Sequence, residues 1–419
     1  MREDKGIFYK IDWVLLGLYL TMVIIGWVNI YAAVYDENHH HIVDLTQRYG
    51  KQMVFILAAL LLAMMILLID PKFFSQFSYF IYGICLLMLI VVIFSGREIS
   101  GSKGWFAIWG YGVQPAEFAK MATCLALAKY LSGMDVNIRK FSTLVVASAI
   151  ILVPASIVLL QHDTGSAIVF LAFFIVLYRA GLTGFVPLAF ILLPLLGVLA
   201  LLIPKAILSG FLFIIVVIIF LRSHRKLKNI FIISAVFLAS VGFVYSVDYT
   251  VKHILEPHQR QRINVLLGMN TDLKGAGYNV NQSLIAIGSG RFFGKGFLQG
   301  TQTKYNFVPE QSTDFIFCTI GEERGFLGSS ILIILYLAFF ARLILAAERQ
   351  RSKFSRLYGY GVAAVLFFHF AINIGMTLGL LPVIGIPLPF ISYGGSSLWA
   401  FTILFFIFIR QDSYRYELV

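Results

Sequence analysis

Charged residues are scarce in this chain of 419 residues, of which only 13% are Asp, Glu, Lys or Arg. Soluble domains typically contain about 25%. Hydrophobic residues make up 59% of the chain, and its mean hydropathy is +0.85. This balance excludes a soluble globular domain and predicts a protein that crosses a membrane several times.

Cysteine is scarce too. The chain has three cysteines, Cys85, Cys124 and Cys318, each in or beside an apolar stretch. They are too few and too scattered for a disulfide framework or a zinc site, and we interpret them as small core residues. Three adjacent histidines at 39–41 lie in a predicted loop, where neighbours rarely converge on one metal. The sequence therefore assigns no metal site.

Long apolar runs dominate what is present. A membrane-spanning helix needs about 17–25 apolar residues, and twelve runs approach this length, at 13–34, 51–69, 75–95, 114–131, 143–160, 166–180, 184–203, 207–222, 229–247, 326–347, 357–379 and 396–411. We predict an all-α, polytopic transmembrane helix bundle that forms one membrane domain over 1–419, with one large extracytoplasmic loop at about 248–314. No cleavable signal precedes residue 13, so the first helix should direct its own insertion.

The distribution of positive charge predicts the orientation. Lys and Arg concentrate in short loops that face the cytoplasm, and here they cluster at 222–228 and 349–356. We therefore expect the N- and C-termini in the cytoplasm and the loop 248–314 outside. We therefore attribute the net charge of +12 to the orientation signal and to attraction to anionic lipid head groups, and not to nucleic-acid binding.

Ionisable residues within or beside apolar segments are candidates for a structural or functional role, because inserting each one into the membrane costs about 2.5–3.5 kcal/mol of free energy. In "QPAEFAKMA", Glu117 and Lys120 are three residues apart, so they share a helix face and can pair. The pair is either a structural ion pair or the lining of an outward cavity. Asp163, in "LLQHDTGSAIVF", either caps the following helix or belongs to a site.

The segment 379–401 cannot form one regular helix, because it carries Pro382, Pro387 and Pro389 and a pair of glycines. Irregular backbone at membrane depth is tolerated where protein buries it or where it lines a wet cavity. We interpret this segment as re-entrant on the outer side; a proline-rich hairpin that only packs is the alternative.

A nucleotide-binding loop is missing as well. In "GSGRFFGKG", five residues separate Gly288 from Gly294 and Lys295, and Gly296 stands where Ser or Thr should bind magnesium. Without ATP, chemistry on the outer face must draw on an activated substrate. A lipid-linked sugar diphosphate is such a substrate.

Five ordered motifs closely resemble the SEDS family (shape, elongation, division, sporulation): "QPAEFAK", "QRQRINVLL", "GAGYNVNQSLIAIGSG", "GKGFLQGTQTKYNFVPEQSTDFIF" and "NIGMTLGLLPVIGIPLPFISYGGSS". The "GTQ" in the fourth is closer to the RodA-like, elongation-type members than to the division-type members. The resemblance implies a peptidoglycan glycosyltransferase of the bacterial cytoplasmic membrane that polymerises lipid II. It also implies a class B penicillin-binding protein, a transpeptidase, as partner, with other elongation-complex proteins.

The resemblance places the catalytic residue at Asp272, just before a Gly-x-Gly-Tyr motif. One base suffices, because the diphosphate leaves as a stable anion that needs charge stabilisation more than an acid. This stabilisation of the diphosphate charge could come from Lys120, Arg260, Arg262, Lys295 or a divalent cation, Mg or Mn. The resemblance implies no nucleotide. The substrate-binding candidates are Glu117, Lys120, Asp163, Trp105, Arg260, Arg262, Gln282, Ser283, Lys295, Glu310, Asp314 and Ser392.

The chain departs from the family pattern in its helix count and at several positions: "QHD" replaces the usual Gln-Pro-Asp, and the Pro usually near the catalytic Asp is missing from "GMNTD". The family implies ten helices, whereas three runs instead of one lie within 184–247 here, and Gly104 stands before Trp105 where the family usually has Arg. An added pair of helices preserves the topology, so the functional assignment survives. A lipid II flippase or transporter, and a non-catalytic scaffold of the wall machinery, remain as alternatives.

Overall fold

The computed structural model describes residues 10–35, 44–99, 101–108, 111–222, 227–254, 260, 277–305 and 307–415. Asp272 and Arg262, two of the predicted site residues, lie outside these ranges. Contacts divide the chain into two compact units, Met1–Leu182 with Asn279–Val419, and Thr183–Tyr278. Each unit is described by itself below, and the single domain expected over 1–419 stays a prediction.

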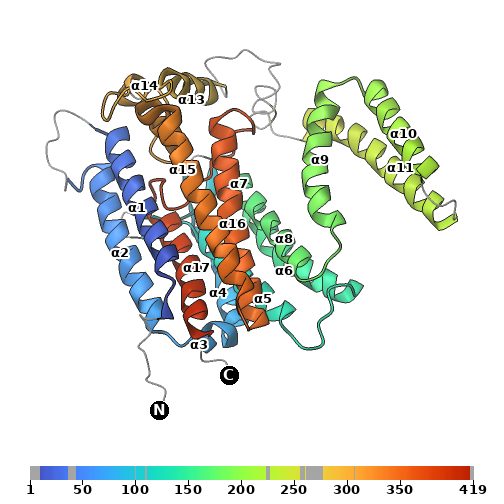
Figure 1. Ribbon diagram of the computed structural model, residues 1–419, viewed down its shortest axis with the longest axis horizontal. Helices are drawn as coiled ribbons and strands as arrows, with labels where there is room; N and C mark the ends of the chain where they lie inside the picture. The colour runs from blue at the N-terminus through green and yellow to red at the C-terminus, as the bar shows by residue number, and fades with distance from the viewer. Residues whose placement is uncertain are drawn as a thin grey trace. The chain divides into compact units, whose positions relative to one another are not determined.

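The first unit is a helix bundle (Figure 1). Its elements are α1 Trp13–Ala33, α2 Arg48–Leu68, α3 Pro71–Gln76, α4 Ser78–Ser95, α5 Pro115–Leu131, α6 Phe141–Leu160, α7 Thr164–Val169, η2 Phe170–Ala172, α8 Phe173–Arg179, α13 Tyr278–Ser289, α14 Thr301–Lys304, α15 Ile316–Glu348, α16 Lys353–Thr377 and α17 Gly395–Tyr414. Among the eight helices of the described residues that are long and apolar enough to cross a membrane, α16 is the most buried, and α5, α8, α15 and α17 all pack against it.

The second unit holds three long apolar helices, α9 Phe185–Leu202, α10 Lys205–Arg222 and α11 Leu227–Tyr249, followed by the short π-helix η3, Thr250–Ile254. Helix α11 packs against both α9 and α10. Most described side chains of α10 and α11 are exposed or half-buried, as expected of helices that face lipid.

A helix lies at each of the twelve predicted apolar runs, which confirms an all-α, multi-pass architecture. Eight helices in the described part of the chain are long and apolar enough to cross a membrane: α1, α2, α4, α6, α10, α11, α15 and α16. The other four runs correspond to α5, α7 to α8, α9 and α17, and the count of twelve spans stays a prediction. The α7 to α8 run is interrupted by a 3-10 turn.

Helix α15 begins ten residues before the predicted run at 326, and a kink explains the difference. Gly325 has φ 64° and ψ −159°, so the helical backbone breaks there. A Cβ atom at Gly325 would lie 2.3 Å from the Gly294 nitrogen, so only glycine fits. The loop after α13 therefore packs directly on the kink.

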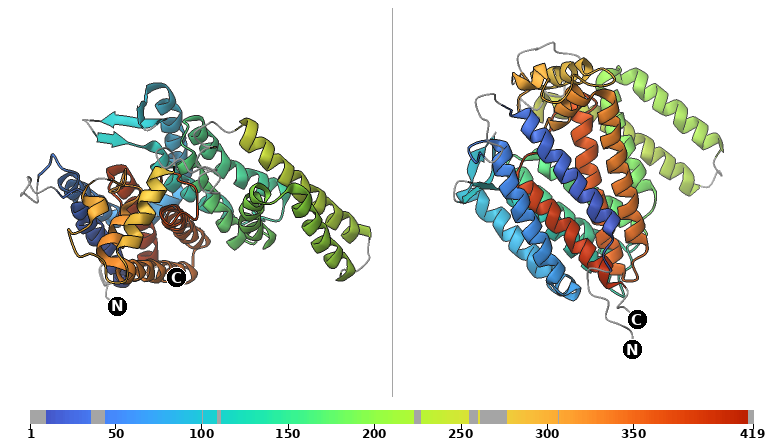
Figure 2. Two further views of the ribbon diagram at one scale, coloured as in Figure 1. Left: turned by 90° about the horizontal axis from the view of Figure 1, so that it is seen from above. Right: turned by 60° about the vertical axis from the view of Figure 1, so that its left-hand side comes forward.

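Three short strands were not predicted. Arg97–Ile99 (β1), Ser102–Ile108 (β2) and Tyr111–Val113 (β3) form an antiparallel sheet in the order β1-β2-β3 (Figure 2). The backbone amide of Lys103 also donates to the Gln161 carbonyl at 3.1 Å. This hydrogen bond connects β2 to the end of α6. Strands this short have a weak sequence signal.

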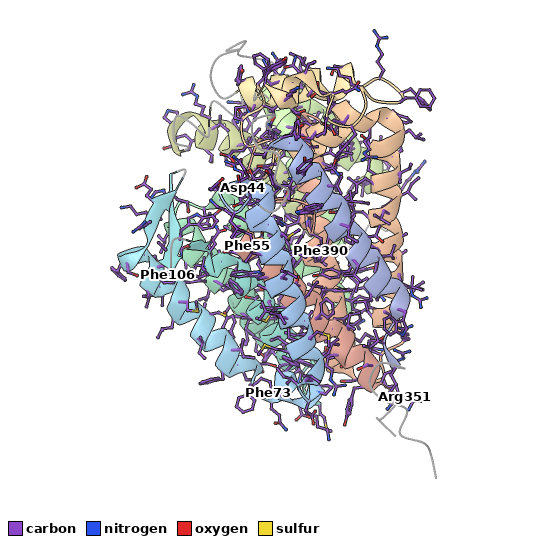
Figure 3. All side chains as sticks on the ribbon, turned by 90° about the vertical axis from the view of Figure 1, so that its left-hand side faces the viewer. Asp44, Phe55, Phe73, Phe106, Arg351 and Phe390 are labelled. Atoms are coloured by element: carbon purple, nitrogen blue, oxygen red, sulfur yellow. The ribbon has the colours of Figure 1, made fainter. Side chains whose placement is uncertain are left out.

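The segment 378–394 has no regular helix or strand, as predicted, and α17 starts at Gly395. Much of the segment is buried, including Ile386, Leu388 and Phe390. The Phe390 ring lies among Tyr19, Phe339, Phe401 and Phe405 in the bundle core (Figure 3). Protein, rather than lipid, therefore surrounds this irregular backbone.

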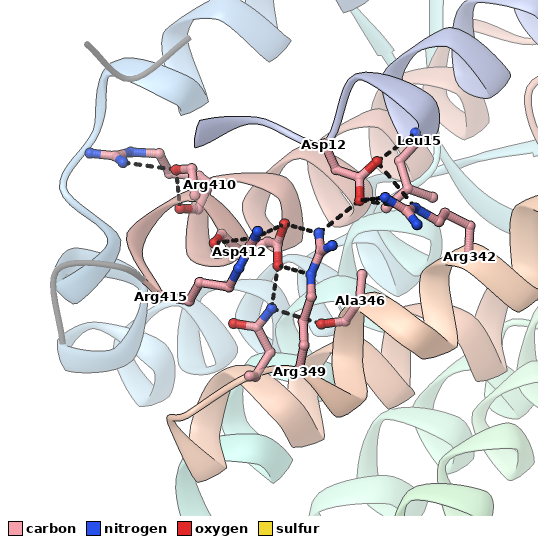
Figure 4. A network of polar contacts seen from close by, with 10 residues as sticks. Asp12, Leu15, Arg342, Ala346, Arg349, Arg410, Asp412 and Arg415 are labelled. Atoms are coloured by element: carbon pink, nitrogen blue, oxygen red, sulfur yellow. Dashed lines mark hydrogen bonds and ion pairs between the residues drawn. The ribbon is translucent and has the colours of Figure 1, made fainter. Parts of the chain in front are cut away.

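A polar network joins the start of α1 to the ends of α15 and α17 (Figure 4). Arg349 donates to Asp12 Oδ2 at 2.7 Å and to Asp412 Oδ1 at 3.0 Å, while Arg342 Nε donates to Asp12 Oδ2 at 3.1 Å. The chain therefore enters and leaves the bundle at the same end.

Candidate functional site

The predicted Glu117–Lys120 pair forms in the first turns of α5. The Lys120 Nζ atom lies 2.7 Å from Glu117 Oε1, and the two side chains are 1% and 3% exposed. Pro115 occupies the first helical position, where its missing N–H costs nothing. The pairing is confirmed. Since both side chains are buried here, their lining of an outward cavity stays a prediction.

Lys120 has a second polar contact that sequence reasoning missed. Its Nζ atom lies 2.8 Å from Nε2 of His369 on α16, and the Phe401 ring centroid is 5.7 Å away. Among the described residues, Glu117 Oε2 has no hydrogen-bond partner. A lone histidine within an apolar run was the sequence signal available for the His369 contact.

Asp163 caps α7 by accepting from the Ser166 amide at 2.9 Å, and its other oxygen accepts from Gln114 Nε2 at 2.6 Å. The capping interpretation is therefore confirmed. Gln114 is the N-cap residue of α5, so Asp163 also ties the start of α7 to the start of α5, one turn before Glu117.

Residues 310–314 lie against the irregular segment. Ser392 Oγ donates to the Thr313 carbonyl at 2.6 Å, and Asn373 Nδ2 donates to the Asp314 carbonyl at 2.8 Å. Glu310 is exposed and lies 3.5 Å from Arg48. The structure thus brings together the predicted residues Glu310, Asp314 and Ser392.

Helix α16 joins this group to the lysine cluster. His369 and Asn373 are four residues apart, so they share one face of the helix. Asn373 Nδ2 also donates to the Ile386 carbonyl at 2.7 Å, and His369 Nδ1 lies 3.2 Å from the Pro387 carbonyl. Both side chains hold the irregular segment against the bundle.

Lys295 is paired with a residue that the sequence analysis missed, Glu322 of α15. The Lys295 Nζ atom lies 2.6 Å from Glu322 Oε1, and the Glu322 carboxylate also accepts from the amides of Thr301, Gln302 and Thr303 at 2.8–2.9 Å. This favours a packing salt bridge for Lys295. Glu322 holds the "GTQ" turn in place.

Four further candidates are more isolated. Ser283 on α13 is buried and donates to the Thr377 carbonyl at 2.9 Å, whereas its neighbour Gln282 is half-buried. Trp105 on β2 is half-buried, with Gly112 against its ring. Arg260 is exposed, and the residues on both sides of it lie outside the described ranges.

Metal binding finds no support from the described residues. Within them, no three His, Cys, Asp or Glu side chains group together in a way that could hold a metal ion. Asp272, the predicted base, lies outside the described ranges. The structure therefore neither adds ligands for the expected divalent cation nor locates the catalytic carboxylate.

The fold and these polar clusters define a multi-pass helical membrane protein with a buried, irregular segment packed against ionisable side chains. The family model of FtsW, RodA and SpoVE, described as cell cycle protein, matches residues 12–209 and 182–417. The chain belongs to this family.

Two known proteins of similar sequence carry the same activity in their names. The chain is 34% identical over 416 residues to peptidoglycan glycosyltransferase RodA of Treponema pallidum, covering 93% of this chain and 94% of that protein. It is 33% identical over 331 residues to peptidoglycan glycosyltransferase MrdB of Escherichia coli K12, covering 79% and 76%.

Solved structures agree with the fold. The crystal structure of Thermus thermophilus RodA aligns with a TM-score of 0.63 at 26% identity, covering 97% of this chain and 98% of that one. A chain from a peptidoglycan synthase complex, described as coordinating polymerization and crosslinking, aligns with a TM-score of 0.71 at 27% identity, covering 97% and 99%.

Proposed function

We propose that this protein is a peptidoglycan glycosyltransferase that polymerises lipid II at the outer face of the cytoplasmic membrane during cell elongation. The observation that carries the proposal is the match to RodA of Treponema pallidum over nearly the full length of both chains. Supporting it, the irregular segment 378–394 and residues 310–314, both within motifs that resemble the SEDS family, pack together.

The reaction we propose joins two sugars. The 4-hydroxyl oxygen of an acceptor GlcNAc attacks the anomeric carbon of the donor MurNAc, and the bond from that carbon to the diphosphate breaks. Asp272 takes the hydroxyl proton, and undecaprenyl diphosphate leaves with the bonding electrons. A second carboxylate of the kind that glycoside hydrolases need has no role.

Stabilisation of the diphosphate falls to cations. Lys295 and Lys120 are already paired with Glu322 and Glu117, so we place this role first on Arg260 and Arg262 of the outer loop. A divalent cation, Mg or Mn, assisting the diphosphate stays a proposal, and no step described here depends on it. Rates measured with and without a chelator test it.

The orientation and the partner belong to the same proposal. We place both termini in the cytoplasm, supported by the charge distribution and by Arg349, which bridges residues at the start of α1 and the end of α17. A class B penicillin-binding protein would cross-link the strands, as the similarity to a synthase complex suggests.

The deciding experiment mixes the purified protein with lipid II and its penicillin-binding partner in the absence of ATP. We expect glycan polymer on a gel, and none with the Asp272→Asn variant. Lipid II that crosses liposome membranes without forming polymer under these conditions would instead support the flippase.

A further inference from the structure

His369 has polar contacts with both the buried lysine of α5 and the irregular segment. It lies on α16, 249 residues away from Lys120 in the sequence, and is fully buried. Its two ring nitrogens face different groups, Lys120 Nζ at 2.8 Å and the Pro387 carbonyl at 3.2 Å. A histidine that only filled space would leave these nitrogens unused.

The donors and acceptors of this cluster determine the protonation of the ring. A lysine ammonium has three donors and no acceptor, so His369 Nε2 must accept from Lys120. The ring is therefore neutral and carries its proton on Nδ1. That N–H then donates to the Pro387 carbonyl, which holds the ring in one orientation.

The Lys120 ammonium is consequently held from three sides. Glu117 Oε1 accepts one of its protons at 2.7 Å, His369 accepts another, and the Phe401 ring lies 5.7 Å away, within the range of a cation–π contact. Without His369, Glu117 would be the one remaining polar contact of the ammonium among the described residues, and the ammonium could move toward it. The histidine thus determines where the charge of Lys120 lies.

We propose that His369 is a positioning residue of the glycosyltransferase: it holds the Lys120 ammonium in place and, through Pro387, ties it to the segment 378–394. This inference rests on the proposed function and on the predicted role of Lys120 in substrate binding, which would be additional to the diphosphate contacts of Arg260 and Arg262. His369 itself has no contact with the reacting atoms. It acts through Lys120.

Two amide substitutions separate the contacts of the ring. In His369→Gln the side-chain oxygen can reach the position of Nε2 and accept from Lys120, whereas in His369→Asn the shorter amide can reach only the position of Nδ1 and donate to Pro387. We expect His369→Gln to polymerise lipid II within about threefold of the wild-type rate. We expect His369→Asn to lose at least tenfold, because a misplacement of about 1 Å can cost on the order of 10²-fold.

The Lys120→Met background shows whether the histidine acts through the lysine. There, His369→Asn should cause no further loss of rate, whereas a purely structural histidine would cause the same loss with or without the lysine. Equal losses in the Gln and Asn variants, a wild-type rate in the Asn variant, or additive losses with Lys120→Met would each overturn the proposal.

Melting temperatures of the same four proteins, wild type, His369→Asn, Lys120→Met and the double variant, provide a readout that needs no activity. Non-additive shifts would support the contact between the two side chains, and additive shifts would overturn it. Failure of the wild-type protein to make polymer would overturn the proposed function, but the melting temperatures would still decide whether His369 holds Lys120.

Discussion

Glu117 and Lys120 show how costly the buried polar groups of this protein are. Both side chains are almost completely buried, and among the described residues Glu117 Oε2 has no hydrogen-bond partner. Removing one member of a buried ion pair costs about 3–5 kcal/mol, because the other charge is left uncompensated. A pair this costly either stabilises the contact of α5 with α16 or serves the reaction.

Replacement of the lysine distinguishes these roles. Lys120→Met should reduce polymerisation while the protein still inserts into the membrane. Because the variant leaves Glu117 unpaired, the matched control is Lys120→Met with Glu117→Gln, which removes both charges and should restore the melting temperature but not the polymerisation rate. A well-folded Lys120→Met variant with a normal rate would exclude an essential role for Lys120.

The predicted base gives the second test at this scale. Asp272→Asn keeps the shape of the side chain but cannot take a proton, and a positioned base typically contributes 10²–10⁴-fold in rate. We therefore expect polymer formation to be nearly abolished, with Asp272→Glu as the comparison. The melting temperature and co-purification of the partner should not change.

If the Asn variant is active and well folded, the base must be another carboxylate. Glu310 and Asp314 are then the first alternatives, since both lie beside the irregular segment. Asp163 is a weaker alternative, because both of its oxygens already accept hydrogen bonds.

At the scale of elements, a polar cluster around Arg349 joins α1, α15 and α17. Burial by itself would raise the pKa of the Asp12 carboxyl, but hydrogen bonds from the Leu15 amide, Arg342 and Arg349 outweigh it and hold that pKa below its usual value. The ionised form is therefore favoured by folding. Acid should weaken this connection.

The direction of the pH effect follows from this lowered pKa. Asp12 stabilises the folded state fully above the ordinary aspartate pKa of about 3.9, and this stabilisation is lost as the pH falls through the lower pKa of the folded protein. We expect melting temperatures measured from pH 7 down to pH 3 to fall less steeply for Asp12→Asn than for the wild type. Identical pH profiles would contradict the role of Asp12.

At the scale of the whole molecule, the sequence predicts which side of the membrane the connection between α10 and α11 faces. The connection "RSHRKLK" between α10 and α11 is strongly basic, and the positive-inside rule places it in the cytoplasm. His224 within it lies outside the described residues. Its side of the membrane is therefore a matter for chemical labelling.

A cysteine substituted for His224 should resist a membrane-impermeant thiol reagent in intact cells and react after the cells are opened. The three native cysteines are buried, so they should add little background, and a cysteine substituted for the exposed Glu310 provides the control on the opposite side. Labelling at position 224 from outside would show that the predicted helix count is wrong.

Particular residues show which structural features could be predicted from the sequence. The prolines of 379–401 correctly predicted irregular backbone, and the spacing of Glu117 and Lys120 correctly predicted their contact, because both effects act within a few residues along the chain. His369 and Glu322 were missed, since their partners are 249 and 27 residues away. The strands at 97–113 were missed because they are short.

The sequence by itself determined that this chain is a helical membrane protein, where its helices lie and which family it belongs to. Lipid offers the backbone no hydrogen bonds, so each apolar run must satisfy its own groups as a helix. Only the tertiary structure decided that Lys120 meets His369, that Arg349 joins Asp12 to Asp412, and that residues 378–394 are buried against 310–314. Such contacts form between segments far apart in the chain, and they depend on how helices pack rather than on any local pattern.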